Sequence, residues 1–135
     1  MMLVSACLAG FPCRYDGAAK PCAEVMALVK AGKAIPVCPE QLGGLPTPRP
    51  PCEIFEGRVV DKNGMDRTED YRRGAEAVLA LARAYGATQA VLQKRSPSCG
   101  SGWVYDGTFS KTLVQGDGIT ARLLTENGIQ VIGIE

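Results

Sequence analysis

The apolar residues of the chain fall into four short runs that are typical of buried β-strands. The runs cover residues 2–6, 34–38, 88–94 and 129–134. Apolar side chains dominate neighbouring positions in these runs, whereas a strand with one wet face alternates apolar and polar residues. The pattern therefore predicts strands that are covered on both faces of a sheet.

Helix-like segments precede the last three strands. They cover residues 22–33, 68–86 and 117–128, and a glycine lies at or near the end of each, as is common after a helix. Asp117 is the predicted N-cap of the last segment. The longest segment repeats its apolar residues at the 3.6-residue period of a helix. Its predicted buried face consists of Ala75, Val78, Leu79, Ala82 and Tyr85.

The alternation of strands and helices predicts an α/β fold. We expect a three-layer arrangement, with a parallel sheet of about four strands and helices on both of its faces. Residues 39–66 interrupt this rhythm: a proline-rich loop precedes a segment, 53–66, that resembles a small hairpin excursion. The length of 135 residues suits a single domain, predicted to span 1–135.

Charge and composition exclude several classes of protein. The net charge of +1 offers no electrostatic reason to bind nucleic acid, which makes such a partner unlikely. No apolar run approaches the roughly 18 residues of a membrane span, and the N-terminus lacks the basic region of a secretory signal. We therefore expect a cytoplasmic protein. Histidine is absent, which excludes imidazole from acid–base chemistry and from metal binding.

Cysteine is the residue type that indicates chemistry. Six in 135 residues is about 4%, well below the 8–10% of a disulfide scaffold. Disulfides are also disfavoured in a reducing cytoplasm, so grouped cysteines point to metal or redox chemistry. The six are Cys7, Cys13, Cys22, Cys38, Cys52 and Cys99.

Three cysteines lie at or just after the carboxyl ends of predicted strands. They are Cys7, Cys38 and Cys99. The carboxyl ends of parallel strands share one edge of a sheet, so these thiols are expected to meet there. Three thiolates without histidine favour a soft metal centre, either an iron–sulfur cluster or zinc. The alternative is that they are small buried residues with no ligand, because free cysteine is often buried.

Three stretches of the sequence resemble the DUF523 family, which includes bacterial thiouracil desulfidases. They are "SACLAGFPCRYDG", "VCPEQLGGLPTPRPPCEI" and "SPSCG". The resemblance implies a [4Fe-4S] cluster with one iron free of protein ligands, and removal of sulfur from a thiolated pyrimidine such as 2-thiouracil. Matched residue by residue, Cys7, Cys38 and Cys99 are the implied cluster ligands. Glu40 and Ser96 are the implied catalytic residues.

Polar residues near these cysteines are candidates for catalysis and substrate binding. Glu40 lies two positions after Cys38, where a carboxylate could act as general base in a chain without histidine; otherwise it is a carboxylate at a helix start or on the surface. Ser98, like its neighbour Ser96, could hydrogen-bond a substrate carbonyl or a cluster sulfide, or simply shape a turn beside a proline. Asp16 could bind a pyrimidine N–H or shape its own turn.

Two other functions remain compatible with the sequence. The chain could be a non-catalytic module that binds zinc or a cluster. It could also be a sulfur carrier, with a persulfide on Cys13 or Cys99. Cys13 lies six residues after Cys7 and could reach the same crevice as a further ligand, although packing in a turn is the simpler interpretation.

Overall fold

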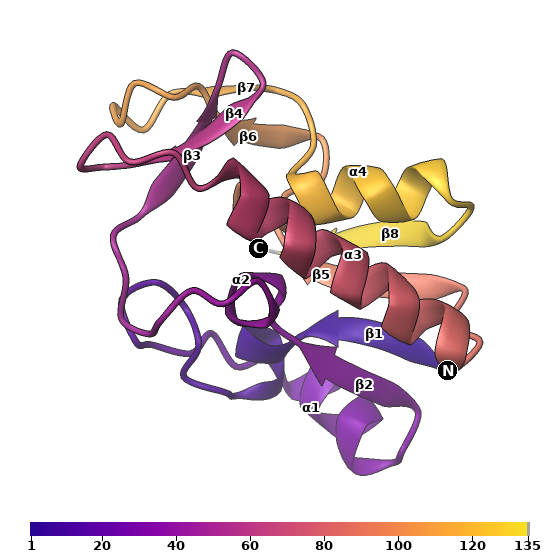
Figure 1. Ribbon diagram of the computed structural model, residues 1–135. Helices are drawn as coiled ribbons and strands as arrows, with labels where there is room; N and C mark the ends of the chain where they lie inside the picture. Colours follow the sequence, from indigo (N-terminus) through magenta and orange to yellow (C-terminus); the bar gives the residue numbers. More distant parts are fainter. Residues whose placement is uncertain (135) are drawn as a thin grey trace.

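The computed structural model describes residues 1–134, and a parallel sheet of four strands lies at its centre (Figure 1). Every neighbouring pair is parallel, in the spatial order β2-β1-β5-β8. The strands are β1 (Met2–Ser5), β2 (Ala34–Val37), β5 (Gln89–Gln93) and β8 (Gln130–Ile134). The predicted α/β fold is confirmed, with each strand one or two residues shorter than the run that predicted it.

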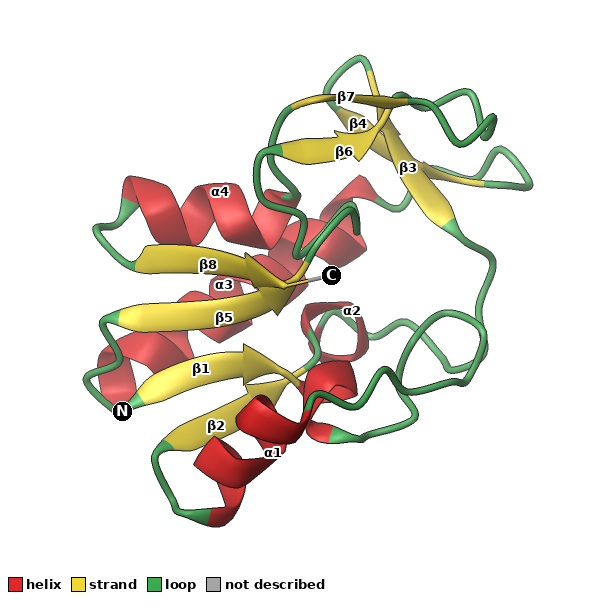
Figure 2. Ribbon diagram, turned by 180° about the vertical axis from the view of Figure 1, so that it is seen from behind, coloured by secondary structure: helices red, strands yellow, loops and turns green. Residues whose placement is uncertain are grey.

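Helices cover both faces of the sheet, as the apolar runs predicted. Along β1 the side chains alternate, so that Leu3 joins the core under α3 and α4 while Val4 joins the core under α1. Helix α1 (Ala23–Lys30) lies on one face, and α3 (Thr68–Ala84) and α4 (Ile119–Glu126) lie together on the other (Figure 2). The two cores make the three-layer architecture.

Two details of the predicted helices are wrong. Tyr85 was placed on the buried face of α3, but it lies beyond the last helical residue and is 60% exposed. Asp117 does not cap α4, because Gly118 occupies the N-cap position. The Asp117 carboxylate instead accepts a hydrogen bond from the Gly102 amide, 2.7 Å away, and so holds a neighbouring loop.

A short helix follows directly after each of the strands β1 and β2, near Cys7 and Cys38. Residues Ala6–Ala9 form a 3₁₀ helix, η1, so Cys7 lies in a helical turn just beyond β1. Cys38 is the N-cap of α2 (Pro39–Leu42), in which Pro39 takes the first helical position that proline favours. Both turns keep these cysteines at the carboxyl edge of the sheet.

Helices α2 and α3 touch through their backbones. A β-carbon added to Gly74 would lie 1.9 Å from the carbonyl oxygen of Pro39, and one added to Gly43 would lie 2.0 Å from that of Asp70. Real atoms do not approach so closely, so both positions require glycine. The contact fixes the helical turn that carries Glu40 against the long helix α3.

Two antiparallel hairpins lie outside the sheet. The predicted excursion forms the first, β3 (Cys52–Phe55) with β4 (Arg58–Asp61). The second, β6 (Trp103–Tyr105) with β7 (Leu113–Gln115), was not predicted. Glu53 joins the two, because its carboxylate accepts hydrogen bonds from the amides of Gly107 and Phe109. Figure 2 shows the hairpins side by side on the same flank of the molecule.

Within residues 1–134, no helix combines the length and the apolar composition that crossing a membrane requires.

Candidate metal centre and active site

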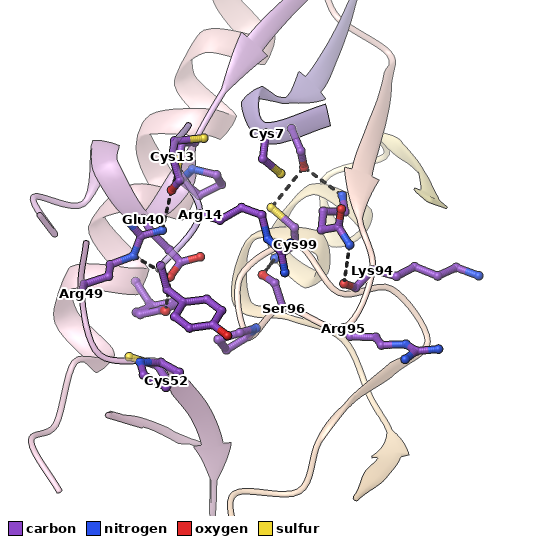
Figure 3. A pocket seen from close by; sticks show the side chains of 18 of the residues that line it. Cys7, Cys13, Arg14, Glu40, Arg49, Cys52, Lys94, Arg95, Ser96 and Cys99 are labelled. Carbon is purple, nitrogen blue, oxygen red and sulfur yellow. Dashed lines mark hydrogen bonds and ion pairs between the residues drawn. The ribbon is translucent and has the colours of Figure 1, made fainter. Parts of the chain in front are cut away.

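A cavity of about 420 Å³ opens at the carboxyl edge of the sheet, where the loops after β1, β2 and β5 meet the two hairpins (Figure 3). Its volume is in the range of small-molecule binding sites. Five cysteines contribute to its wall: Cys7, Cys13, Cys38, Cys52 and Cys99. The predicted meeting of Cys7, Cys38 and Cys99 at one sheet edge is therefore observed.

Cys7, Cys13 and Cys38 influence one another's pKa values, and the Cys38 thiol donates a hydrogen bond to the Cys13 carbonyl at 3.8 Å. The Cys13 thiol hydrogen-bonds the Cys7 sulfur, which lowers the pKa of Cys7 below its usual range even though burial opposes this. At Cys13, a hydrogen bond with Cys38 lowers the pKa, but the bond to Cys7 and burial outweigh it and raise the pKa to about 11. The hydrogen bond to Cys13, together with burial, raises the pKa of Cys38. Among the cysteines that line the cavity, only Cys7 thus has a lowered pKa.

Cys99 lies in the loop after β5 and is held from two sides. The Ser5 hydroxyl donates to its sulfur at 3.5 Å, and its amide donates to the Ser96 hydroxyl oxygen at 2.8 Å. Burial raises the pKa of Cys99 to about 12, against the lowering effect of the Ser5 hydrogen bond. In Figure 3 the sulfurs of Cys7 and Cys99 point into the same part of the cavity.

The donor set fits a cluster better than a single ion. Among the described residues, no three histidine, cysteine, aspartate or glutamate side chains converge closely enough to hold one metal ion. A cubane cluster has a different requirement, because each thiolate binds a separate iron at a separate corner. Three thiols around one cavity, without histidine, provide soft ligands of the kind that iron–sulfur clusters use.

Glu40 projects from α2 into the cavity and is fixed through one oxygen. Its Oε1 accepts hydrogen bonds from Arg49 Nε, at 3.2 Å, and from the Tyr71 hydroxyl. Tyr71 is buried at the start of α3, where burial and the neighbouring Glu40 carboxylate raise its pKa. Tyr71 therefore stays protonated and remains a hydrogen-bond donor.

Arg49 ties three segments together beneath the cavity. Besides binding Glu40, its guanidinium donates to the Cys13 carbonyl at 2.9 Å and to the Thr47 hydroxyl at 2.9 Å. Its side chain is almost fully buried, and the attraction of Glu40 helps to raise its pKa despite a lowering effect of burial. A buried guanidinium with these bonds positions Glu40 relative to the loop of Cys13.

The other predicted polar residues lie in different surroundings. Ser96 lines the cavity, and its oxygen accepts hydrogen bonds from the amides of Ser98 and Cys99. Ser98 is fully buried away from the cavity wall, and its hydroxyl pairs with Thr120 at 2.8 Å. Asp16 is exposed, does not line the cavity, and accepts a hydrogen bond from the Ala18 amide. Ser96 thus lies on the cavity wall with the cysteines, whereas Ser98 and Asp16 do not line it, although the Ser98 side chain contacts Cys99.

Cations surround the cavity. Five of them form no ion pair with a carboxylate of residues 1–134: Arg14, Lys20, Lys62, Lys94 and Lys111. Arg14 is close enough to Cys7 to favour its thiolate. Positive charge at the rim stabilises anionic thiolates and an anionic cluster in the cavity.

The cavity residues that the sequence prediction missed include Tyr71 and Ser5, which hydrogen-bond predicted site residues, and Gln93. Tyr71 lies four positions before Ala75, so the helical period of α3 could have placed it on the buried face. Ser5, in β1, and Gln93, in β5, both line the cavity next to Cys99. The sequence predicted that both residues lie at strand ends. It did not predict their hydrogen bonds, because these depend on how β1 and β5 separate.

Comparison with known proteins gives three results, two of which name thiouracil as the substrate. The family model described as 2-thiouracil desulfurase matches residues 2–135. The uncharacterized protein YbbK of Bacillus subtilis (strain 168) is 44% identical over 142 residues, which cover 98% of this chain and 94% of YbbK. The solved structure of the [4Fe-4S]-dependent thiouracil desulfidase TudS superposes with a TM-score of 0.94 at 47% identity. That match covers 98% of this chain and 89% of the TudS chain.

Proposed function

Because the chain belongs to the 2-thiouracil desulfurase family, we propose that it is a [4Fe-4S]-dependent desulfidase acting on a free thiolated pyrimidine such as 2-thiouracil. The products are the pyrimidine, uracil in this case, and sulfide. The enzyme acts as one domain over residues 1–135. It works in the cytoplasm, where reducing conditions keep its cysteines available.

The observation that carries this proposal is the position of three cysteines from distant parts of the sequence on one cavity wall. Cys7, Cys38 and Cys99 hold the cluster, one each from the loops after β1, β2 and β5. When bound, the cluster supplies a soft Lewis-acidic iron that accepts the substrate sulfur. Arg14 and the lysines at the rim offset its negative charge.

Glu40 is the general base. Oε1 is occupied by Arg49 and Tyr71, which leaves Oε2 to accept a proton from the water that attacks the thiocarbonyl carbon. The two hydrogen bonds on Oε1 fix the carboxylate plane, so that Oε2 keeps one direction in the cavity.

Ser96 orients the substrate. Its oxygen accepts two backbone amides, which hold the side chain in place and leave the hydroxyl hydrogen free to donate. A carbonyl oxygen of the pyrimidine is the acceptor that suits this hydrogen. In this arrangement Ser96 binds the ring, Glu40 activates water, and the cysteines present the iron.

Anaerobic preparation of the protein tests the proposal. We expect about four irons and four sulfides per chain, and release of sulfide from 2-thiouracil. Cys38→Ala should lose both the brown colour and turnover, while its fold is retained. Cys22→Ala is the matched control, because Cys22 packs beside α1 and does not line the cavity. One zinc per chain without sulfide, or a Cys38→Ala protein as active as the parent, would contradict the proposal.

A further inference from the structure

The last hydrogen bond between β1 and β5 is made by a side chain. The ladder of these strands pairs Met2 with Gln89, Leu3 with Ala90 and Val4 with Val91, and ends there. One step further, the Gln93 amide donates to the Ser5 hydroxyl oxygen at 2.9 Å. Ser5 is only 2% exposed, so this bond satisfies an amide where the two strands separate.

The same hydroxyl reaches the sulfur of Cys99. Ser5 Oγ lies 3.5 Å from Cys99 Sγ, within the range of hydrogen bonds to sulfur, and a dashed line that ends at the Cys99 sulfur marks this contact in Figure 3. Because the Gln93 amide occupies a lone pair of Oγ, the hydroxyl hydrogen is free to point at the sulfur. The bond spans 94 positions of sequence and joins β1 to the loop after β5.

We infer that Ser5 is a positioning residue for the metal centre, which holds Cys99 Sγ in its ligating direction through the hydrogen bond from its hydroxyl. This inference rests on the proposed function, because it takes Cys99 to be a cluster ligand. A hydroxyl that donates to a charged sulfur makes a stronger bond than one that donates to a neutral thiol. The bond is therefore worth most when the sulfur carries the charge of a ligand.

Two consequences follow for the cluster. A hydrogen bond to a ligand sulfur stabilises the more negative, reduced state, so it raises the reduction potential. It also retains the ligand, because groups that orient metal ligands typically contribute roughly 10-fold to 100-fold to metal affinity. Neither effect is expected of a serine that only pairs the Gln93 amide.

The test uses Ser5→Ala and Ser5→Thr in the full chain, loaded with cluster anaerobically. Thr125→Ala is the matched control, since its hydroxyl bonds the Ala121 carbonyl within α4 and lies outside the cavity wall. The readouts are the reduction potential of the cluster, the rate of iron transfer to a chelator, and the unfolding of the cluster-free proteins in urea. We expect Ser5→Ala to have a more negative potential and roughly 10-fold faster iron loss. Ser5→Thr and Thr125→Ala should resemble the parent in both.

The outcomes separate this inference from the proposed function. If Ser5→Ala unfolds more easily without cluster but keeps the parent's potential and iron-loss rate, Ser5 is only structural and the inference is wrong. Unchanged values in all three readouts overturn it as well. If the parent chain takes up no iron, the proposed function itself is contradicted, and the inference is contradicted as well.

Discussion

The two carboxylate oxygens of Glu40 have different surroundings. Oε1 is bound by Arg49 and by Tyr71, whereas Oε2 has no hydrogen bond from the described residues. Tyr71 lies in α3 and Arg49 lies in the proline-rich loop. The Glu40 carboxylate therefore links these two segments through its hydrogen bonds. An acid–base group with one fixed and one free oxygen needs little reorganisation when it accepts a proton.

Replacing Glu40 with glutamine separates the base from the cluster. Glu40→Gln keeps a carbonyl oxygen for the bonds from Arg49 and Tyr71, so we expect the iron content of the parent. Sulfide release should fall by roughly 10²-fold or more, because the amide does not accept the proton of water. Iron analysis and a sulfide assay check this, with Glu24→Gln on α1 as the control. Parent-like turnover in Glu40→Gln would remove Glu40 from the mechanism.

At the scale of elements, the close contact between α2 and α3 sets the position of two site residues. Gly43 and Gly74 let the helix backbones touch, and α2 begins directly after Cys38 and contains Glu40. Because no side chains separate the two backbones at this contact, α2 cannot shift toward α3 by a change of side-chain conformation. The geometry of the cavity therefore depends on two glycines that do not line it.

Gly74→Ala tests this dependence. The added methyl group would overlap the Pro39 carbonyl, so α2 must move away, at a cost of about 1–3 kcal/mol in the free energy of unfolding. We expect weaker cluster retention and slower sulfide release, since Cys38 and Glu40 move with α2. Urea unfolding and iron analysis measure both effects. Glu76→Ala, on the exposed side of α3, should change stability by less than about 0.5 kcal/mol.

Asp66, near the start of α3, makes the stability of the fold depend on pH in a predictable direction. Its carboxylate accepts hydrogen bonds from Thr68 and from Arg58, which lower its pKa from 3.8 to about 2. A lowered carboxyl pKa stabilises the fold above the unfolded value, and this contribution is lost as the pH falls from about 4 toward 2. The stability difference between the parent and Asp66→Ala should therefore narrow between pH 6 and about pH 2.5 in urea unfolding. A difference that stays constant or widens would contradict this.

At the scale of the whole molecule, the parallel sheet explains why the meeting of the three cysteines on one cavity wall was predictable. Strand direction alone brings the residues after β1, β2 and β5 to one edge, so the meeting of Cys7, Cys38 and Cys99 required no knowledge of side-chain packing. The fold was predictable from a second feature, since its strands are nearly continuous apolar runs. The family predicted from the three motifs is likewise confirmed.

The sequence did not reveal that Ser98 and Asp16 lie off the cavity wall, or that a second hairpin forms. Ser98 turns away from the cavity because Thr120 of α4 offers it a partner, and no local pattern reveals that pairing. Asp16 is used by its own turn. The hairpin of β6 and β7 escaped prediction because its strands are three residues each and are joined by a long polar loop. Side-chain direction and short pairings are decided by neighbours from elsewhere in the chain.

Loss of the cluster should weaken the whole fold. Its proposed ligands come from loops far apart in sequence, so the bound group links strands that are otherwise joined only by the sheet and its cores. A group that binds only the folded state with about 2 kcal/mol should raise the unfolding temperature by roughly 5 °C or more. Anaerobic chelation of iron should therefore lower the melting temperature of the parent by that amount. Cys38→Ala should show no such drop, and an unchanged parent would contradict the prediction.

The two hairpins lie outside the central sheet, and Tyr105, Phe109 and Lys111 from the second one reach the cavity wall. Cys7, Cys38, Cys99 and Glu40 come from the sheet edge and α2, so the wall formed by the second hairpin can vary while those residues stay unchanged. Exchanging the segment between β6 and β7 is thus a route to enzymes with altered substrate range and unaltered sulfur chemistry. The residues that the second hairpin adds to the wall can thus be exchanged separately from the cysteines.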